Sequence, residues 1–263
     1  MKNCTEIEIK YKKRFSICTL VTNFSEYEEM VHSFETAGFS EKTADFFYID
    51  NSEFNHDDGY TGTNKFLNQS NYKYIIICHQ DILLKFDSID VLDKCINEIE
   101  ELDPNWAILG NAGFQGFTER FYRITDPWGD NRNTGKFPAK VKSLDENFLL
   151  VKNESNLSLS HDLSGFHMYG TDLCTIAKIL GWNSYVINFH LFHKSAGNGG
   201  SDFNASRSMF IKKYQKCLKS LWIRTPCTSL IVTKSRWLNN ILNRKFFYSI
   251  KKRGEQLKCF FNV

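Results

Sequence analysis

Several short polar clusters in this sequence contain side chains that can bind a metal ion, hold phosphate or accept a proton. His79-Gln80-Asp81 directly follows the apolar segment YIIIC. A carboxylate just beyond a buried strand is well placed to bind a divalent cation that bridges a diphosphate, and oxygen ligands suit Mg²⁺ or Mn²⁺. Taken alone, Asp81 is better explained as the cap of an ordinary turn.

Two further polar clusters follow apolar segments in the same way. Thr22-Asn23 ends the segment FSICTLV, and Asp50-Asn51-Ser52 ends ADFFYI. The second cluster can accept hydrogen bonds from a base or ribose and donate to phosphate, but an Asx turn explains the isolated tripeptide equally well. Ligands of parallel α/β sheets bind beyond the carboxyl ends of the strands, so three polar clusters at strand ends together favour a binding site.

Two downstream segments add further candidates. In FHMYGTD, Asp172 either caps the helix that begins there or acts as a general base on a hydroxyl group, whereas His167 is more typical of a satisfied core histidine. In HLFHKSAGN, His190 and His193 cannot both lie on one face of a strand, because side chains alternate. We favour His193 for a metal site and Lys194 for phosphate, although an ordinary surface loop would explain both.

The elements that would position these residues alternate between strands and helices. Ser25, with Glu28 three residues later, predicts a capping box at the start of the first helix. The alternation predicts an α/β fold with a mostly parallel sheet flanked by helices. Residues 114–142 are expected to form a long functional loop or lid. Strands are predicted at 15–21, 44–49, 74–78, 106–109, 148–151 and 184–188, and helices at 25–37, 63–69, 87–101, 171–180 and 206–221.

Composition indicates a soluble, cytoplasmic protein. The chain has 263 residues, of which 42% are hydrophobic and 24% charged, and no apolar run approaches the ~20 residues of a membrane-spanning helix. The eight cysteines form no CxxC pair, and several lie within apolar segments. We therefore expect reduced, buried thiols in place of disulfides or a zinc site.

Charge divides the chain into two regions. The net charge is +3, but residues 205–263 contain fourteen Lys and Arg against one acidic residue, whereas residues 1–204 contain nineteen basic and twenty-nine acidic residues. This asymmetry predicts a catalytic domain at 1–204 and a basic, aromatic-rich, mainly helical extension at 205–263.

The stretch from Ser16 to Gly197 resembles the GT-A glycosyltransferases, specifically the bacterial glycosyltransferase-like branch related to family two. YIDNS, IICHQDILL, SLDENFLLV, GFHMYGTDLC and FHKSAG carry this resemblance, in that order along the chain. It implies a Rossmann-like GT-A domain and a hexosyltransferase. Such an enzyme would transfer a sugar from a nucleotide-diphospho-sugar, a UDP-sugar being favoured, to a glycan or lipid-linked glycan in bacterial surface polysaccharide synthesis.

The resemblance also implies residue roles. CHQD stands where other GT-A enzymes have Asp-X-Asp, which assigns Mn²⁺ or Mg²⁺ to Asp81 with His193. His79 replaces the first acid of that motif, so metal binding is expected to be weaker or to use fewer protein ligands. Asp172 becomes the base of an inverting reaction. The nucleotide-sugar site would contain Thr22, Asn23, Asp50, Asn51, His79, Gln80, Asp81 and Lys194.

An acceptor pocket is expected within the segment 114–142, because aromatic faces pack against sugar rings and arginines pair with phosphates. Asp145 and Glu146 would lie near this acceptor, although a solvated turn is as plausible. The predicted acceptor residues are Arg120, Arg123, Trp128, Arg132 and His167.

The basic extension, 205–263, interleaves Lys and Arg with aromatic residues. Anionic bilayers and nucleic acids both attract such segments. Because the resemblance implies transfer onto carbohydrate, we prefer a peripheral position on the inner face of the cell membrane over nucleic acid. A solvated helical face that packs on the acidic domain remains the simplest alternative.

Three other functions compete with a transferase. A sugar-nucleotide or glycan-binding module without catalysis would explain His79 in the metal motif. A nucleotidyltransferase would need a Gly-rich phosphate loop, and residues 15–25 contain none. A nucleic-acid-binding protein would rely on the basic extension alone.

Overall fold

The computed structural model describes residues 10–197, 200–217, 219–225 and 229–244. The chain divides into two compact units, Met1–Ser208 and Met209–Val263. This division lies within helix α5 (Ser201–Cys217), as does the predicted boundary after residue 204. Each unit is considered by itself.

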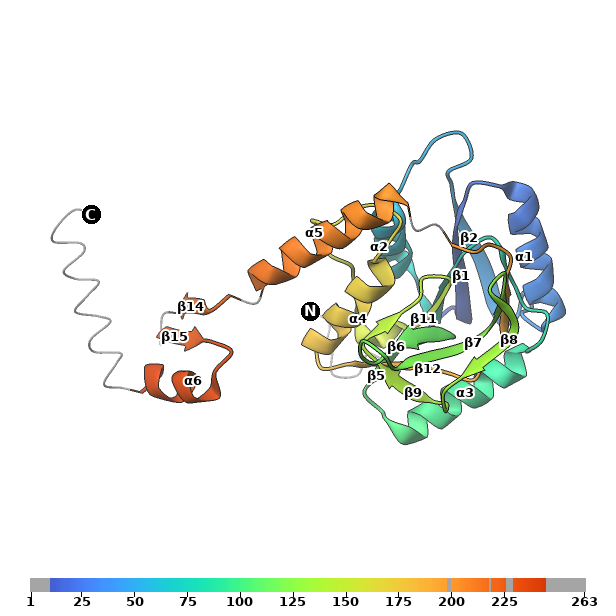
Figure 1. The fold of residues 1–263 in the computed structure, drawn as a ribbon. Coiled ribbons are helices and arrows are strands. Elements are labelled where there is room, and N and C mark those ends of the chain that lie inside the picture. The colour runs from blue at the N-terminus through green and yellow to red at the C-terminus, as the bar shows by residue number, and fades with distance from the viewer. Residues whose placement is uncertain (1–9, 198–199, 218, 226–228, 245–263) are drawn as a thin grey trace, which may run out of the picture. The chain divides into compact units, whose positions relative to one another are not determined.

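The first unit is built on a seven-stranded sheet with the order β2-β1-β3-β11-β5-β12-β9 (Figure 1). β1 pairs in parallel with β2 and β3, and β12 pairs in parallel with β5. β11 is antiparallel to both β3 and β5, and β9 is antiparallel to β12. The predicted α/β fold with a mostly parallel sheet is confirmed. The strands are β1 (Lys13–Val21), β2 (Ala44–Asp50), β3 (Tyr72–Cys78), β5 (Trp106–Gly110), β9 (Ala139–Val141), β11 (Phe148–Lys152) and β12 (Asn183–Val186).

Helices pack on this sheet through apolar residues repeated at helical spacing. In α1, Met30 and Phe34 are fully buried one turn apart. The N-cap of α1 is Asn23 and not Ser25, because the Asn23 side chain accepts hydrogen bonds from two free backbone N–H groups of the first turn. The helices are α1 (Phe24–Thr36), α2 (Gly59–Gln69), α3 (Ile89–Leu102) and α4 (Tyr169–Ile179), with a 3₁₀ turn at Asn153–Ser155.

The segment 114–142 is not the irregular loop that composition predicts, since β9 joins the first sheet and β7 and β8 belong to a second sheet with the order β10-β6-β7-β13-β4. β8 pairs with β7 as a hairpin. The short strands and the polar sequence of β8 explain the error, because they give little hydrophobic alternation. The strands are β4 (Ile82–Leu83), β6 (Ala112–Phe114), β7 (Arg120–Asp126), β8 (Gly129–Thr134), β10 (Ser143–Leu144) and β13 (Leu191–His193).

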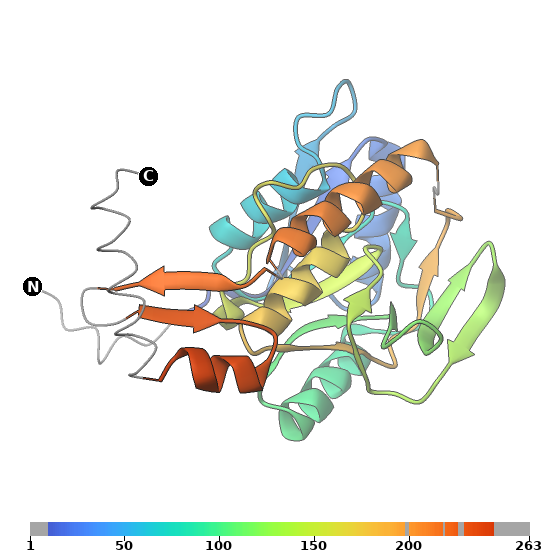
Figure 2. The ribbon, with the colours of Figure 1, turned by 60° about the vertical axis from the view of Figure 1, so that its left-hand side comes forward.

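The second unit contains the strands β14 (Leu221–Arg224) and β15 (Ser229–Val232), which form an antiparallel hairpin, and helix α6 (Arg236–Leu242) (Figure 2). The prediction of a mainly helical extension missed this hairpin. Phe246, Phe247 and Tyr248, which belong to its predicted aromatic residues, lie outside the described residues. Within the described part of the chain, no helix has the length and apolar character needed to span a bilayer.

Described cysteines of the first unit are buried free thiols, as expected for reduced residues. Cys18 and Cys78 lie on neighbouring strands of the sheet, Cys95 on α3 and Cys174 on α4. Burial raises the pKa of each thiol, which keeps the group neutral and makes it a small core side chain.

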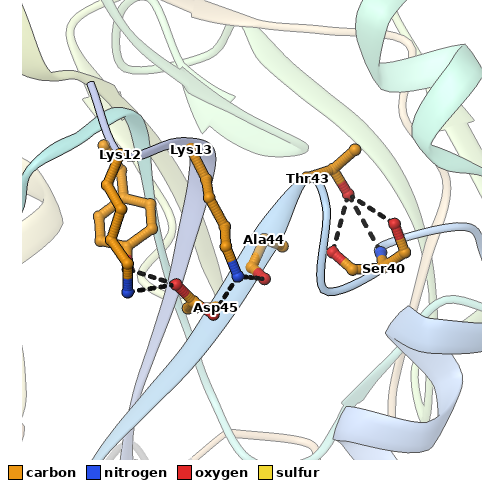
Figure 3. Close-up of polar contacts among 7 residues, drawn as sticks. Lys12, Lys13, Ser40, Thr43, Ala44 and Asp45 are labelled. Carbon is orange, nitrogen blue, oxygen red and sulfur yellow. Dashed lines mark hydrogen bonds and ion pairs between the residues drawn. The ribbon is translucent and has the colours of Figure 1, made fainter. Parts of the chain in front are cut away.

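A charged cluster fixes the start of the parallel strands (Figure 3). The Asp45 carboxylate on β2 accepts hydrogen bonds from Lys12 Nζ (3.0 Å), Lys13 Nζ (2.5 Å) and Tyr72 Oη (2.5 Å). Burial would raise the pKa of Asp45, but the bonds from Lys13, Tyr72 and Lys12 outweigh it and lower the pKa to about 2. The ionised carboxylate therefore connects three strands, β2, β1 and β3.

We expect Asp45→Asn to lower the free energy of unfolding by about 1 kcal/mol at pH 7, because the cluster is partly exposed. A carboxyl with a lowered folded-state pKa stabilises the fold above the unfolded value of 3.8, and this contribution is lost as the pH falls towards 2. Urea unfolding at pH 7 and at pH 3 should show a smaller difference at the lower pH. Equal stability of the two proteins at pH 7 would exclude this role.

Candidate active site

A cluster of possible metal ligands lies where β3 ends. His79, Asp81 and His193 each direct one ligand atom towards the others, and these atoms lie within 4.8 Å of one another. Asp81 precedes β4, and β4 pairs with β13 so that His193 lies opposite Ile82. The Lys194 N–H donates to the Asp81 carbonyl at 3.1 Å, which continues this pairing. Two segments far apart in sequence thus bring the histidine to the carboxylate.

The charges within the cluster balance one another. Asp81 Oδ1 lies 3.4 Å from His193 Nε2. Burial opposes ionisation of both groups, but the attraction between their charged forms outweighs it. The pKa of Asp81 is therefore lower than its ordinary value, and the pKa of His193 is higher than its ordinary value. Burial and the neighbouring His193 lower the pKa of His79, which favours its neutral, ligating form.

Two imidazoles and one carboxylate fit a divalent transition metal. Imidazole nitrogens favour transition-metal ions over Mg²⁺, which takes oxygen donors, and the carboxylate also suits Mn²⁺. His79 Nε2 lies 3.2 Å from the hydroxyl of Tyr169 on α4, and its backbone N–H donates to the Asn147 carbonyl at 3.1 Å. These contacts fix the His79 ring, as outer partners commonly do for metal-binding histidines.

Beside this cluster lies an open cleft of about 900 Å³. Its walls combine the two histidines with carboxylates and aromatic rings, which is the surface expected around a sugar. Its lining residues include His79, His193, His167, Tyr122, Trp128, Phe166, Phe203, Asp126, Arg132, Asp145, Glu146 and Asn147.

Glu146 is the most perturbed carboxyl in the cleft. Burial, with a contribution from the charge of Asp145, raises the pKa of Glu146 to about 8. Its Oε1 accepts a hydrogen bond from the Gly170 N–H at 3.1 Å, in the first turn of α4. Met168, the N-cap residue, makes no side-chain cap, so Glu146 satisfies a backbone N–H that would otherwise be free.

Gly170 permits this close approach. A Cβ at this position would lie 2.8 Å from the Leu144 carbonyl oxygen and 3.2 Å from Glu146 Cγ. The glycine of GFHMYG therefore has a steric function, because a side chain there would displace Glu146 from the helix.

Asp172 does not line the cleft, which argues against its predicted role as a base. Its side chain is fully buried, and its two oxygens accept hydrogen bonds from the Ser160 N–H at 2.8 Å and the Ser160 hydroxyl at 2.9 Å. The aspartate of the GTDLC motif thus anchors the segment before α4. Asp172 follows the cleft residues Phe166 and His167 closely in the sequence, which is why the sequence predicted a catalytic role for it.

The predicted nucleotide residues of the first strand end form a local hydrogen-bond network. The Gln80 side chain accepts from the Thr22 and Asn23 N–H groups and donates to Thr22 Oγ1 and Glu26 Oε2. This network ties the end of β3 to the end of β1. Thr22 and Asn23 are exposed and Gln80 is half-buried, at strand ends where the sheet topology predicts a ligand.

At the next strand end, Asp50 is exposed and forms the Asx-type turn that the sequence also allowed, accepting bonds from the Ser52 N–H and hydroxyl. These bonds lower the pKa of Asp50. Asn51 is buried and binds the backbone of His56 and Asp57, so it orders the loop that follows β2.

The predicted basic residues are mostly committed to protein partners. Lys194 forms ion pairs with Glu29 and Glu26 of α1. Arg132 lines the cleft, but it pairs with Asp126 at 2.6 Å. Arg120 and Arg123 do not line the cleft, and Arg123 donates to Asn188 and Asn131.

The predicted acceptor residues Trp128 and His167 do line the cleft. Trp128 is 72% exposed, and its Nε1 donates to the Ala196 carbonyl at 3.1 Å. Sequence reasoning assigned no role to Tyr169 or Asn147. The sequence placed Asp145 and Glu146 near the acceptor, and both line the cleft, but it gave Glu146 no role as a base.

No protein-family model matches the sequence. A protein of Fuscovulum blasticum described as "ATP synthase subunits region ORF 6" is 36% identical over 208 residues, which cover 77% of this chain and 84% of that protein. The chain belongs to the family of this ORF 6 protein. The description of the relative gives a gene region and states no activity.

Two solved structures show the fold of this ORF 6 family member. The mannosyltransferase PcManGT from Pyrobaculum calidifontis, in complex with GDP-Man and Mn²⁺, has a TM-score of 0.51 at 11% identity. GalNAc-T7, with UDP, GalNAc and Mn²⁺, has a TM-score of 0.51 at 9% identity. They match 79% and 77% of this chain, which spans 66% and 48% of their lengths. The predicted GT-A fold is confirmed.

We expect Asp172→Asn to lower the free energy of unfolding by about 1–3 kcal/mol, because it disturbs a buried, hydrogen-bonded acceptor. Nucleotide binding should stay within twofold of the wild type in titration calorimetry. Asp90→Asn, on the exposed face of α3, is the control and should change neither quantity. Unchanged stability with complete loss of turnover would restore Asp172 as the base.

Proposed function

We propose that this chain is a metal-dependent glycosyltransferase. It transfers a sugar from a nucleotide-diphospho-sugar, with a UDP-sugar favoured, to a glycan or lipid-linked glycan in bacterial surface polysaccharide synthesis. The carrying observation is the convergence of His79, Asp81 and His193 beside a cleft that also contains Glu146. The two structures of similar fold support this proposal, because one contains GDP-Man with Mn²⁺ and the other contains UDP with Mn²⁺.

The donor diphosphate would lie near the cluster at the end of β3. His79, Asp81 and His193 would hold Mn²⁺ in preference to Mg²⁺, and the ion would offset charge on the phosphates and on the leaving nucleotide. The base and ribose would lie along the carboxyl ends of β1 and β2, near Asn23 and Asp50.

Glu146 is the proposed general base, in place of Asp172. A base is most effective when its pKa lies near the working pH, and the pKa of Glu146 is raised to about 8. The ionised carboxylate would accept the proton of the acceptor hydroxyl as that oxygen attacks the sugar carbon, and the reaction would invert its configuration. The bond from Gly170 orients the carboxyl group towards α4 and keeps it on the cleft wall.

The acceptor would pack against the aromatic part of the cleft. Trp128, Phe166 and Phe203 offer ring faces of the kind that sugars contact. The predicted arginines are not placed to bind phosphate, because Arg132 is neutralised by Asp126 and Arg123 does not line the cleft. The cleft therefore favours a sugar ring over a phosphate group at this end.

Thermal unfolding with UDP, GDP and CDP, each with Mn²⁺, Mg²⁺ or no metal, tests the donor site. We expect one nucleotide to stabilise the protein with Mn²⁺, by about 2.7 kcal/mol at a hundredfold excess over its dissociation constant. Asp81→Asn and His193→Ala should abolish this shift, and Asp90→Asn should retain it. If no nucleotide gives a metal-dependent shift, the donor site is wrong.

Glu146→Gln should lower turnover about 10²–10⁴-fold while leaving donor binding unchanged, since it keeps the side chain's shape but cannot accept the proton. It should also raise the melting temperature at high pH. With its folded-state pKa raised, Glu146 costs stability as the pH rises from 4.5 to 8, and the cost is constant above 8.

The pH series separates a catalytic effect from a structural one. Turnover of the wild type should rise with a midpoint near pH 8, and Asp145→Asn should shift that midpoint to lower pH by removing a like charge. Full activity of Glu146→Gln would eliminate Glu146 as the base. Intact metal-dependent nucleotide binding without turnover on any donor would favour a non-catalytic binding module.

A further inference from the structure

The second unit presents positive charge and apolar side chains together. Its described residues include eight Lys and Arg and no acidic residue. Among them, Ile231 alone is a buried apolar side chain, at 3% exposure. Seven apolar side chains are exposed, and these are Met209, Ile211, Leu221, Ile223, Val232, Trp237 and Leu238.

Strand register gathers four of the aliphatic residues on one face. In the β14–β15 hairpin, Leu221 lies opposite Val232, and Ile223 lies opposite Leu230. Residues directly opposite in an antiparallel pair, and those two apart along a strand, point to the same side of the sheet. Leu221, Ile223 and Val232 are 50%, 41% and 45% exposed. We call these four residues the aliphatic face.

Helix α6 is fastened to β15 by two asparagines. Asn243 accepts from the Ile231 N–H and donates to its carbonyl, both at 2.8 Å. Asn239 makes the equivalent pair with the backbone of Thr233, at 2.7 and 3.0 Å. These bonds hold the short helix along the strand, and Trp237 of the helix remains 69% exposed.

Such a unit needs a partner. A two-stranded hairpin is marginally stable by itself, and a seven-residue helix gains little stability without packing. Exposed aliphatic residues gathered on one face commonly mark a docking surface. The partner must cover the aliphatic face and also neutralise the surrounding basic residues.

An anionic bilayer meets both requirements. Its headgroups attract Lys and Arg near the surface, its acyl boundary receives aliphatic side chains, and tryptophan is enriched at this interface. Long basic side chains can extend to the headgroups while their stems cover apolar surface. A nucleic acid would neutralise the charge but leave the aliphatic face uncovered, and a second copy would bring two basic units together.

We propose that the aliphatic face docks on the surface of a membrane rich in anionic lipid. Lys219, Lys234 and Arg236, next to the hairpin in sequence, contact the headgroups. This specifies the surface for the membrane position that the sequence predicts, and it bears on the proposed transfer to a lipid-linked acceptor. Docking itself requires no donor, metal or turnover, so it can fail or succeed independently of the transferase reaction.

Co-sedimentation of the full chain with vesicles tests this proposal. The vesicles contain either phosphatidylcholine alone or phosphatidylcholine with about 30% phosphatidylglycerol, a typical anionic surface. We expect at least tenfold tighter binding to the anionic vesicles. The difference should shrink in about 0.5 M salt, which screens exposed charges.

Paired substitutions assign the binding to the hairpin. Ile223→Thr with Val232→Thr keeps β-branched residues in the strands, and Lys234→Gln with Arg236→Gln removes two charges. Each pair should weaken binding to anionic vesicles about tenfold or more. Ile179→Thr with Lys178→Gln changes one aliphatic and one basic exposed residue on α4 and should leave binding unchanged. Circular dichroism and the nucleotide titration report whether each variant is folded.

Three results would overturn the proposal. The first is equal binding to neutral and anionic vesicles, and the second is binding that is insensitive to both hairpin pairs. The third is the absence of vesicle binding. In that case, light scattering that shows a dimer disrupted by Ile223→Thr with Val232→Thr would assign the face to a second copy. Salt-sensitive binding of a labelled single-stranded oligonucleotide, weakened by Lys234→Gln with Arg236→Gln, would assign the unit to nucleic acid.

Discussion

The site depends on the pairing of two very short strands, β4 and β13. Asp81 comes immediately before β4, and His193 is the last residue of β13, so this ladder brings the two side chains to 3.4 Å. The first sheet can form without this ladder, because its strands pair through other segments. The second sheet therefore builds the candidate metal centre, and the first supplies the strand end on which it stands.

This arrangement balances charges that would be costly if separated. A buried carboxylate without a partner pays a large desolvation penalty, and a buried imidazolium does too. Because Asp81 and His193 offset each other, the protein can hold both close to the cleft without a ligand. A metal ion would replace the proton of His193 as the positive partner of Asp81, so the site is prepared for a cation.

The sequence predicted six of the seven strands of the first sheet, because most of them are apolar runs that stand out in the sequence. It missed β9, which has only three residues and lies within the segment predicted as a loop. His79 and Asp81 could be predicted as ligands because they lie at the carboxyl end of a predicted strand. His193 could be predicted for the same reason, since it also follows an apolar segment. The segment 114–142 was wrongly interpreted because strands such as β8 are exposed and polar, and their pairing depends on the sheet around them. Cap residues also differed, since Asn23 and Ser25 are chemically similar and lie close together.

The proposed base is the clearest case in which a motif and its expected function separate. GFHMYGTDLC builds the cleft wall without contributing the perturbed carboxyl itself: Tyr169 contacts His79, Gly170 makes room for Glu146, and Asp172 binds Ser160. The perturbed carboxyl group belongs to SLDEN, the segment that comes immediately before β11 in the sequence. Sequence alone could not distinguish Asp172 from Glu146, because both are acids beside apolar segments.

The packing of α4 against the loop before β11 is what favours Glu146 over Asp172 as the proposed base. It surrounds Asp172 with hydrogen-bond donors deep in the core and leaves Glu146 on the cleft wall. At that wall, the first turn of α4 favours the ionised form of Glu146, whereas burial and Asp145 favour the neutral form more strongly. The result is a carboxyl group on the cleft wall that can exchange a proton near neutral pH. Asp172, in contrast, is fully buried, binds Ser160 and does not line the cleft.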